Sequence, residues 1–320
     1  MPRPNPADYG TSVTKPADFD NFWAEIEAQA AAIPLNATIT PVPLRSTPAV
    51  EVFEVHYDSL DGVRVAGWYC LPRQRSDPLG PLPTIVVYPG YVSEPTLPKN
   101  LAAQGYAAFG AAPRGKLRSN AQYNPGYPGL LVHNILDRNT YGYRGFYVDA
   151  LRVIDFLDAQ PEIDSQRIGV TGGSQGGALT LLAAAMRPQI AAAAAGAPYL
   201  AGMMDAAVLT HTTPYEELVE YLRLYPEREE QVRETLAYFD IHNFVDRIRC
   251  PIIVHIGLQD DVCPAETGYA VYERIGTEQK KLYAYDGYGH DSNGYGHGAV
   301  IDAFFREHLG QQLAGSPTSI

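Results

Sequence analysis

A serine stands between two glycines, each two residues away, in the segment Gly172-Gly173-Ser174-Gln175-Gly176. The segment follows an expected strand and precedes an expected alanine-rich helix. A turn in this place must be sharp to lift one hydroxyl out of the backbone, and glycines at these positions remove side chains that would collide. The N-terminus of the following helix favours an oxyanion that develops beside it. The pattern predicts that Ser174 is a nucleophile.

Two other interpretations of this segment are weaker. Glycine-rich turns without chemistry also produce such a pentapeptide, but the expected strand and helix on either side favour a nucleophile. A dinucleotide-binding loop is disfavoured, because the spacing of Gly169, Gly172 and Gly176 does not match G-x-G-x-x-G.

A serine nucleophile needs a histidine base and a carboxylate that orients the base. On a sheet of this kind the three residues follow in the order serine, acid, histidine. Asp260 stands after an expected strand over residues 251–257, where the acid belongs. Asp261 competes for the role, and an ordinary surface turn is the alternative, because aspartates are common in loops. We predict that Asp260 is the acid, with Asp261 next.

His290 lies in a glycine-rich loop just past an expected strand over residues 281–286. This is the expected place of the base, and we predict that His290 fills that role. His297 is near the start of the last expected helix, where a histidine can simply cap or pack. The other histidines do not fit the chain order or the loop: His56, His133, His211, His242, His255 and His308. His290 and His297 lack a third ligand at a readable spacing, so we expect no metal.

The tetrahedral intermediate of acyl transfer needs hydrogen-bond donors for its oxyanion. The backbone N–H of Gln175, the residue after the nucleophile, is the first expected donor. The second is expected in Pro89-Gly90-Tyr91, after an expected strand over residues 84–88, most simply the N–H of Tyr91. Taken alone, Pro89-Gly90 would indicate only a turn.

The elements that must position these residues alternate between strands and helices. Their alternation predicts an α/β fold with a mostly parallel sheet, helices on both faces and the active site at the carboxyl ends of the strands. Asp61-Gly62 indicates a hairpin turn, which predicts an antiparallel N-terminal edge hairpin. The apolar patterns predict strands over 50–57, 63–70, 84–88, 106–111, 167–172, 190–196, 251–257 and 281–286, and helices from Asp18 onward and over 144–157, 177–186, 266–275 and 298–309.

Length and composition indicate one large globular domain over residues 1–320. Of the 320 residues, 46% are hydrophobic and 19% are charged, which excludes a disordered chain. Residues 1–48 are expected to form an N-terminal extension with a helix, and residues 200–248 a helical insertion over one end of the sheet. The net charge of −12 disfavours nucleic acid and anionic membranes as partners.

The N-terminal residues and the cysteines bear on location. Residues 1–6 contain no apolar core of a signal peptide, and no apolar stretch is long enough to cross a bilayer. Three cysteines without close spacing argue against a disulfide framework. We therefore expect a cytoplasmic protein.

The nucleophile turn resembles that of the acetyl xylan esterase and cephalosporin C deacetylase family, carbohydrate esterase family seven, within the α/β-hydrolase superfamily. The resemblance covers about residues 15–310. It implies the triad Ser174, Asp260 and His290, with oxyanion donors at Tyr91 and Gln175. Further similar segments are Arg114-Gly115, Tyr127-Pro128-Gly129, Ile135-Leu136-Asp137, Thr140-Tyr141 with Tyr143-Arg144, Tyr238-Phe239-Asp240, Asn243-Phe244, and Gly257-Leu258-Gln259-Asp260 with Cys263-Pro264.

Four departures from the family pattern concern the surroundings of the triad. Lys116 replaces the glutamine of an Arg-Gly-Gln motif, and Asp291 replaces the glutamate of a His-Glu pair. Pro89 stands directly before Gly90-Tyr91, and residues 92–95 replace a glycine-rich segment. We expect these changes to affect pocket shape, substrate preference and assembly rather than the triad.

The resemblance implies a serine esterase that removes acetyl groups from sugars, xylo-oligosaccharides and cephalosporin C. It also implies no cofactor and a ring-like hexamer built from dimers. A broad-specificity short-chain carboxylesterase or a peptidase on the same fold is the alternative. About 80 residues precede the first core strand, which leaves no room for the propeller of a prolyl peptidase. A non-catalytic binding protein is disfavoured, because no expected triad member is lost.

Overall fold

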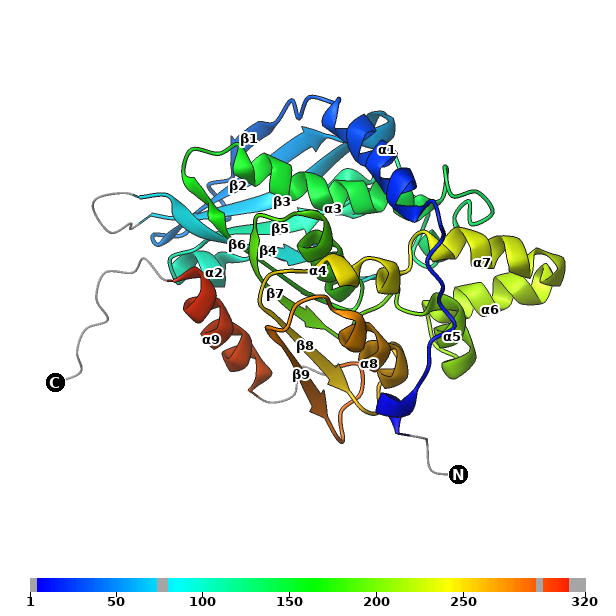
Figure 1. Ribbon diagram of the computed structural model, residues 1–320. Helices are drawn as coiled ribbons and strands as arrows, with labels where there is room; N and C mark the ends of the chain where they lie inside the picture. Colours follow the sequence, from blue (N-terminus) through cyan, green and yellow to red (C-terminus); the bar gives the residue numbers. More distant parts are fainter. Residues whose placement is uncertain (1–4, 74–79, 292–295, 311–320) are drawn as a thin grey trace.

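The computed structural model describes residues 5–73, 80–291 and 296–310, which form a twisted sheet with helices on both faces (Figure 1). The nine-stranded sheet has the order β1-β2-β3-β5-β4-β6-β7-β8-β9. Its strands are β1 (Thr38–Pro41), β2 (Val50–Asp58), β3 (Arg64–Pro72), β4 (Leu82–Tyr88), β5 (Ala107–Ala112), β6 (Ile163–Gly173), β7 (Ile190–Gly196), β8 (Ile252–Gly257) and β9 (Lys280–Tyr285).

The direction of the strands changes across the sheet, as the sequence predicts. From β5 through β4, β6, β7 and β8 to β9 every pairing is parallel, whereas β1, β2, β3 and β5 pair antiparallel. Asp61 and Gly62 connect β2 to β3 with positive φ at both residues, the conformation that a tight hairpin needs. β1 was not predicted, because all four of its residues are exposed and carry no hydrophobic alternation.

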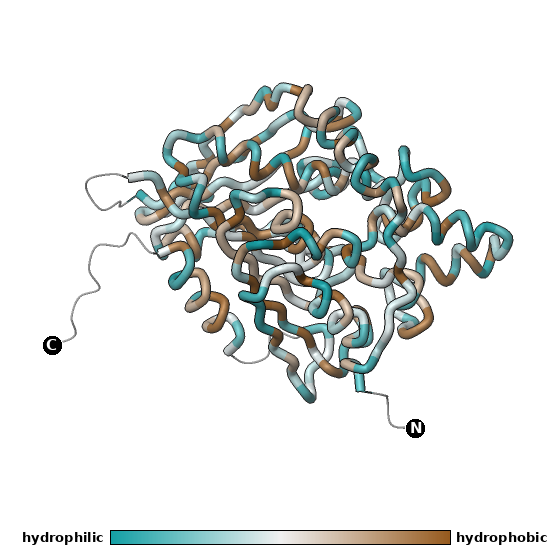
Figure 2. The backbone as a smooth tube through the Cα atoms, in the orientation of Figure 1, coloured by the Kyte–Doolittle hydropathy of each residue, from teal (hydrophilic) through white to brown (hydrophobic). Residues whose placement is uncertain are grey.

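The central strands are buried on both faces, which explains their continuous apolar sequence. Ile85 and Val86 of β4 are adjacent and fully buried, but they belong to separate clusters on opposite faces of the sheet. Apolar residues accordingly gather along the central strands in Figure 2. The helices are α1 (Phe19–Ala31), α2 (Lys99–Ala103), α3 (Gly142–Asp158), α4 (Gln175–Met186), α5 (Met203–Leu209), α6 (Tyr215–Leu224), α7 (Glu229–Ala237), α8 (Ala265–Arg274) and α9 (His297–Leu309).

The helical insertion expected over residues 200–248 is present as α5, α6 and α7, which project from one end of the sheet (Figure 1). Its base is closed by Asp240, whose carboxylate accepts hydrogen bonds from the N–H groups of Gly202 and Met203. Trp23 of α1 is fully buried and donates its indole N–H to the Tyr238 carbonyl at 2.8 Å. The N-terminal helix therefore packs against the base of the insertion.

Two further expectations concern the whole chain. The assignment of residues 1–320 to one domain stays a prediction. Within the ranges that the structure describes, no helix combines the length and apolarity needed to cross a membrane.

Candidate active site

Ser174 lies at the carboxyl end of the sheet, where β6 ends and α4 begins. Its backbone has φ 57° and ψ −121°, a conformation that non-glycine residues rarely adopt and that surrounding contacts must hold. The Ser174 N–H donates to the Gly196 carbonyl at 2.9 Å, and its carbonyl accepts from the Tyr199 N–H at 3.1 Å. The end of β7 thus holds the strained turn in place.

The two glycines around Ser174 are required by close backbone contacts. A Cβ atom at Gly172 would lie 2.6 Å from the Gly176 carbonyl carbon. A Cβ atom at Gly176 would lie 2.3 Å from the Tyr88 carbonyl oxygen. Both distances are too short for a side-chain atom. The two glycines of G-x-S-x-G are therefore needed because the start of α4 lies directly against the end of β6 and the end of β4.

Asp260 and His290 come together, although they are far apart in the sequence. His290 Nδ1 lies 2.9 Å from Asp260 Oδ2. Asp260 is almost fully buried, and its Oδ1 also accepts the N–H groups of Val262 and Cys263, each at 2.8 Å. The carboxylate is therefore held rigidly, and it can orient the imidazole and stabilise its charged form.

The two competing residues lie elsewhere. The Asp261 side chain is exposed, and its backbone carbonyl accepts hydrogen bonds from the hydroxyls of Thr210 and Thr212. His297 begins α9 and is buried, with Nδ1 2.6 Å from the Tyr285 hydroxyl. Burial lowers the pKa of His297. Asp261 therefore has the surroundings of an ordinary loop aspartate, and His297 those of a histidine packed in the interior.

The Ser174 side chain contacts a cysteine next to the predicted acid loop. Among the described residues, no hydrogen bond joins the Ser174 hydroxyl to His290, and the Ser174 side chain instead interacts with the Cys263 thiol. Burial and the Asp260 charge raise the pKa of that thiol well above its usual range, which keeps it neutral. Hydrogen bonds of catalytic groups are often loose without substrate and tighten when substrate binds.

The two expected oxyanion donors are uncommitted. Within the described part of the chain, no acceptor takes the backbone N–H of Tyr91 or of Gln175. Gln175 is the first residue of α4, so its N–H has no partner inside the helix.

Side chains not foreseen from the sequence fix the residues around these donors. The Tyr91 hydroxyl donates to Glu217 Oε1 at 2.7 Å, and Glu217 Oε2 accepts the Gly129 N–H at 2.8 Å. Burial raises the pKa of Glu217, and these hydrogen bonds offset part of that effect. The Tyr143 hydroxyl donates to Gln175 Oε1 at 2.9 Å. No local pattern marks Glu217, because its role depends on how α6 packs over the loop.

Asp260 lines one surface hollow, of about 580 Å³, together with residues from segments 5–10, 209–212 and 261–266. A surface hollow of about 590 Å³ lies between residues 12–18, residues 136–139 and α7, and Ser174 does not line it. In residues 5–73, 80–291 and 296–310 no group of three or more histidine, cysteine or acidic side chains is placed to hold a metal ion.

A serine turn between strand and helix on a mostly parallel sheet, beside an Asp–His pair, defines an α/β-hydrolase. The sequence matches the acetyl xylan esterase (AXE1) family over residues 1–308. The chain belongs to this family, as the resemblance noted above predicts.

Solved structures of this family are similar over nearly the whole chain. The acetyl xylan esterase from Paenibacillus sp. R4 is 34% identical, with a TM-score of 0.88, and covers 97% of this chain and 100% of its own. Acetyl xylan esterase 1 from Thermoanaerobacterium sp. JW/SL YS485 is 26% identical, with a TM-score of 0.86, over 96% and 98%. The acetyl esterase Axe7A of Xylanibacter ruminicola is 28% identical over 286 residues, which are 83% of this chain but only 62% of that protein.

Proposed function

We propose that the protein is a serine esterase that removes acetyl groups from acetylated sugars and xylo-oligosaccharides. The observation that carries the proposal is the strained Ser174 turn, together with the 2.9 Å contact between His290 and Asp260 at the same end of the sheet. Membership of the acetyl xylan esterase family supports the acetyl group and the carbohydrate as parts of the substrate.

The proposed mechanism assigns one role to each side chain. His290 Nε2 takes the proton of the Ser174 hydroxyl as its oxygen attacks the ester carbonyl, and Asp260 stabilises the imidazolium that forms. The N–H groups of Tyr91 and Gln175 bind the oxyanion of the tetrahedral intermediate. His290 then returns the proton to the leaving sugar hydroxyl. A water activated by the same histidine releases acetate and restores Ser174.

Three finer points stay part of the proposal. Cephalosporin C as a second substrate, a hexameric assembly and a cytoplasmic location rest on the family resemblance and the sequence alone. Light scattering at micromolar concentration would contradict the assembly if it returned the mass of a single chain.

Replacement of Ser174 by alanine tests the proposal directly. We expect Ser174→Ala to lower kcat for p-nitrophenyl acetate and acetylated xylose by roughly 10⁴-fold or more, with only oxyanion binding left. The wild type should prefer acetate to butyrate and octanoate. Near-normal turnover by a folded Ser174→Ala protein would refute the nucleophile, and equal kcat/KM for acetate and octanoate would favour the broad-specificity carboxylesterase.

The two histidines provide a matched pair of variants. His290→Ala should abolish turnover, because it removes the proposed base, whose imidazole contacts the Asp260 carboxylate. His297→Ala should lose some stability, since its ring is buried, but should keep most of kcat and the wild-type fall in activity toward low pH. An inactive His297→Ala beside an active His290→Ala would reverse the assignment.

A further inference from the structure

Lys116 is a buried cation whose partners are the carbonyls of the loop that carries Tyr91. Only 3% of its surface is exposed. Its Nζ donates to the Gly90 carbonyl at 2.9 Å and to the Tyr91 carbonyl, and it lies 4.1 Å from the centre of the Tyr127 ring. Among the described residues, no carboxylate lies within salt-bridge distance of Nζ.

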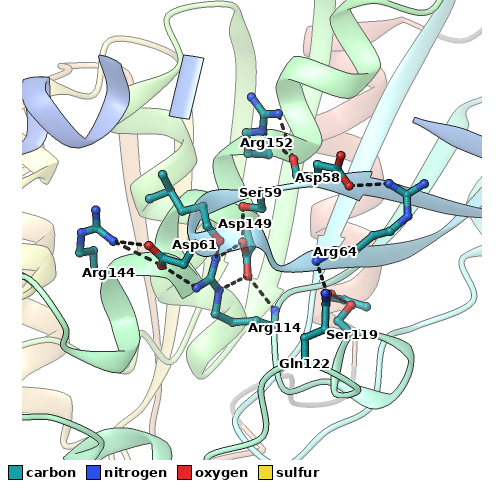
Figure 3. Close-up of polar contacts among 12 residues, drawn as sticks. Asp58, Ser59, Asp61, Arg64, Arg114, Ser119, Gln122, Arg144, Asp149 and Arg152 are labelled. Atoms are coloured by element: carbon teal, nitrogen blue, oxygen red, sulfur yellow. Dashed lines mark hydrogen bonds and ion pairs between the residues drawn. The ribbon is translucent and has the colours of Figure 1, made fainter. Parts of the chain in front are cut away.

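The turn that presents Lys116 is rigid. Its backbone N–H donates to the Pro113 carbonyl at 3.0 Å, and Gly115 before it has φ +80°. Arg114, two residues earlier, is held by two side-chain hydrogen bonds to Asp149 of α3, as Figure 3 shows. The backbone that carries the Lys116 side chain is therefore held in place relative to the loop of Gly90 and Tyr91.

The contact with the Gly90 carbonyl orients the peptide group between Gly90 and Tyr91, which contains the expected oxyanion donor. A trans peptide group places its C=O and the following N–H on opposite sides of the chain. The Gly90 carbonyl and the Tyr91 N–H belong to one such group. With the carbonyl bound to Lys116 Nζ, the Tyr91 N–H must point away from Lys116.

A second hydrogen bond ties this carbonyl to the nucleophile turn. Gln175 Nε2 donates to the Gly90 carbonyl at 3.3 Å, and the N–H of the same residue is the other expected oxyanion donor. The Tyr143 hydroxyl donates to Oε1 of the same Gln175 amide and so fixes its orientation. The two donors are thus linked through one carbonyl oxygen, to which Lys116 is also bound.

The charge of Lys116 adds to this geometry. Hydrogen bonds from ionised donors are stronger than neutral ones, and they polarise the groups that they join. An ammonium on the Gly90 carbonyl makes the Tyr91 N–H of the same peptide a better donor. Burial lowers the pKa of Lys116 to about 8, and the Glu94 charge offsets part of this, so the ammonium form prevails at neutral pH.

We propose that Lys116 is a positioning residue for the reaction: it aims and polarises the Tyr91 N–H, and thereby stabilises the oxyanion of the tetrahedral intermediate. The proposal rests on the function proposed above. It assigns Lys116 no proton transfer and no contact with the substrate.

Two substitutions of Lys116 separate its hydrogen bonds from its charge. Lys116→Met keeps the apolar stem but removes every donor, and Lys116→Gln keeps an uncharged donor. One oxyanion donor is worth about 100- to 1000-fold in kcat, so we expect a smaller loss of roughly 10- to 100-fold for Lys116→Met, with KM within about twofold of wild type. The kcat of Lys116→Gln should lie between that of the wild type and that of Lys116→Met. Lys281→Met is the matched control, because it removes an exposed lysine that lies 4.6 Å from the centre of the Tyr283 ring.

The pH profile is a readout that a purely structural role would not move. The wild-type kcat should fall above about pH 8 as the ammonium loses its proton, and Lys116→Met should lack this alkaline limb. The titratable groups around Lys116 are Glu94, Tyr91 and Tyr127. Burial raises the pKa of both tyrosines far above this range, so neither produces the limb.

The outcomes decide between the inference and the function on which it rests. A folded Lys116→Met protein with kcat within twofold of wild type, a loss confined to KM, or an unchanged alkaline limb would overturn the inference while Ser174-dependent activity stands. Wild-type turnover that survives Ser174→Ala would overturn both. If Lys116→Met does not fold by circular dichroism, Lys116→Gln decides through the pH profile: it carries no charge and should also lack the alkaline limb, and an unchanged limb would overturn the inference.

Discussion

Arg114 and Lys116 are buried cations on one turn, two residues apart, but their surroundings are opposite. Arg114 faces a buried carboxylate: its Nε lies 2.8 Å from Asp149 Oδ2, and Nη2 lies 3.0 Å from Oδ1 (Figure 3). Ser59 adds a hydrogen bond to the same carboxylate, so the Asp149 cluster is fully paired. Lys116 donates to two carbonyl oxygens and lies over an aromatic ring, and among the described residues no carboxylate pairs with it directly.

The pKa values of the two cations follow this difference. Burial is the largest influence on the pKa of Arg114 and by itself lowers it, but the charges and hydrogen bonds of Asp149 and Asp61 together outweigh burial and raise it. Burial lowers the pKa of Lys116 to about 8, because no comparable negative charge faces it. A buried charge beside an opposite charge mainly affects stability. A buried charge without such a partner polarises the polar groups that it contacts. In this protein those groups are the carbonyls of Gly90 and Tyr91.

The largest effect on stability should come from breaking the paired cluster. Asp149 is fully buried, so Asp149→Asn leaves the Arg114 charge without its buried carboxylate, with the half-exposed Asp61 as the remaining acidic partner, and should lower the free energy of unfolding by about 3–5 kcal/mol. Urea denaturation measures this loss. Asp155→Asn is the control on the same helix, because its ion pair with Arg187 is partly exposed and should contribute about 1 kcal/mol or less. Equal losses in both variants would contradict the contrast between paired and exposed charges.

A smaller effect should distinguish Lys116 by its dependence on pH. The folded pKa of Lys116 lies below its unfolded value of 10.5, so between about pH 8 and pH 10 the unfolded chain binds more protons than the folded one. Stability therefore rises with pH in this window. We expect the wild type to gain on the order of 2–3 kcal/mol in free energy of unfolding relative to Lys116→Met between about pH 7 and pH 10. A difference between the two proteins that does not change with pH would show that Lys116 is not a strained charge.

The smallest effect should come from the rim of the paired cluster. The Asp61 side chain is about half exposed and lies 3.2 Å from both Arg114 Nη1 and Arg144 Nη1. Its φ is 61°, a conformation that asparagine adopts as readily as aspartate. Asp61→Asn should therefore change the free energy of unfolding by less than about 1 kcal/mol. A thermal unfolding scan that showed a loss as large as that of Asp149→Asn would place Asp61 inside the cluster.

The sequence predicted much of the fold because the information was local. Runs of apolar residues marked the central strands, and Asp61-Gly62 marked the hairpin that joins β2 and β3. β1 was not predicted, because this exposed edge strand carries no hydrophobic pattern. Element ends differ by a few residues from those expected, since they depend on capping and packing contacts.

The candidate site divides in the same way. Chain order and glycine spacing pointed to Ser174 and to the loops of Asp260 and His290. The sequence favoured Asp260 over Asp261, and this assignment stays a prediction. In the structure the Asp260 carboxylate accepts two backbone N–H groups, whereas the Asp261 side chain is exposed to solvent. A sequence pattern does not distinguish two adjacent aspartates, because the direction of each side chain depends on the path of the backbone.

The sequence by itself determined the features that one segment encodes: a serine on a sharp turn, strands buried on both faces, and a polar loop after each of them. Tertiary structure alone decided which distant groups meet. It brought Asp149 to Arg114, Glu217 to Tyr91, and Lys116 to the carbonyl of Gly90. None of these partners is marked by spacing or composition. The physical reason is that a buried charge is defined by what surrounds it in space, and those surroundings come from separate helices and loops that only folding brings together.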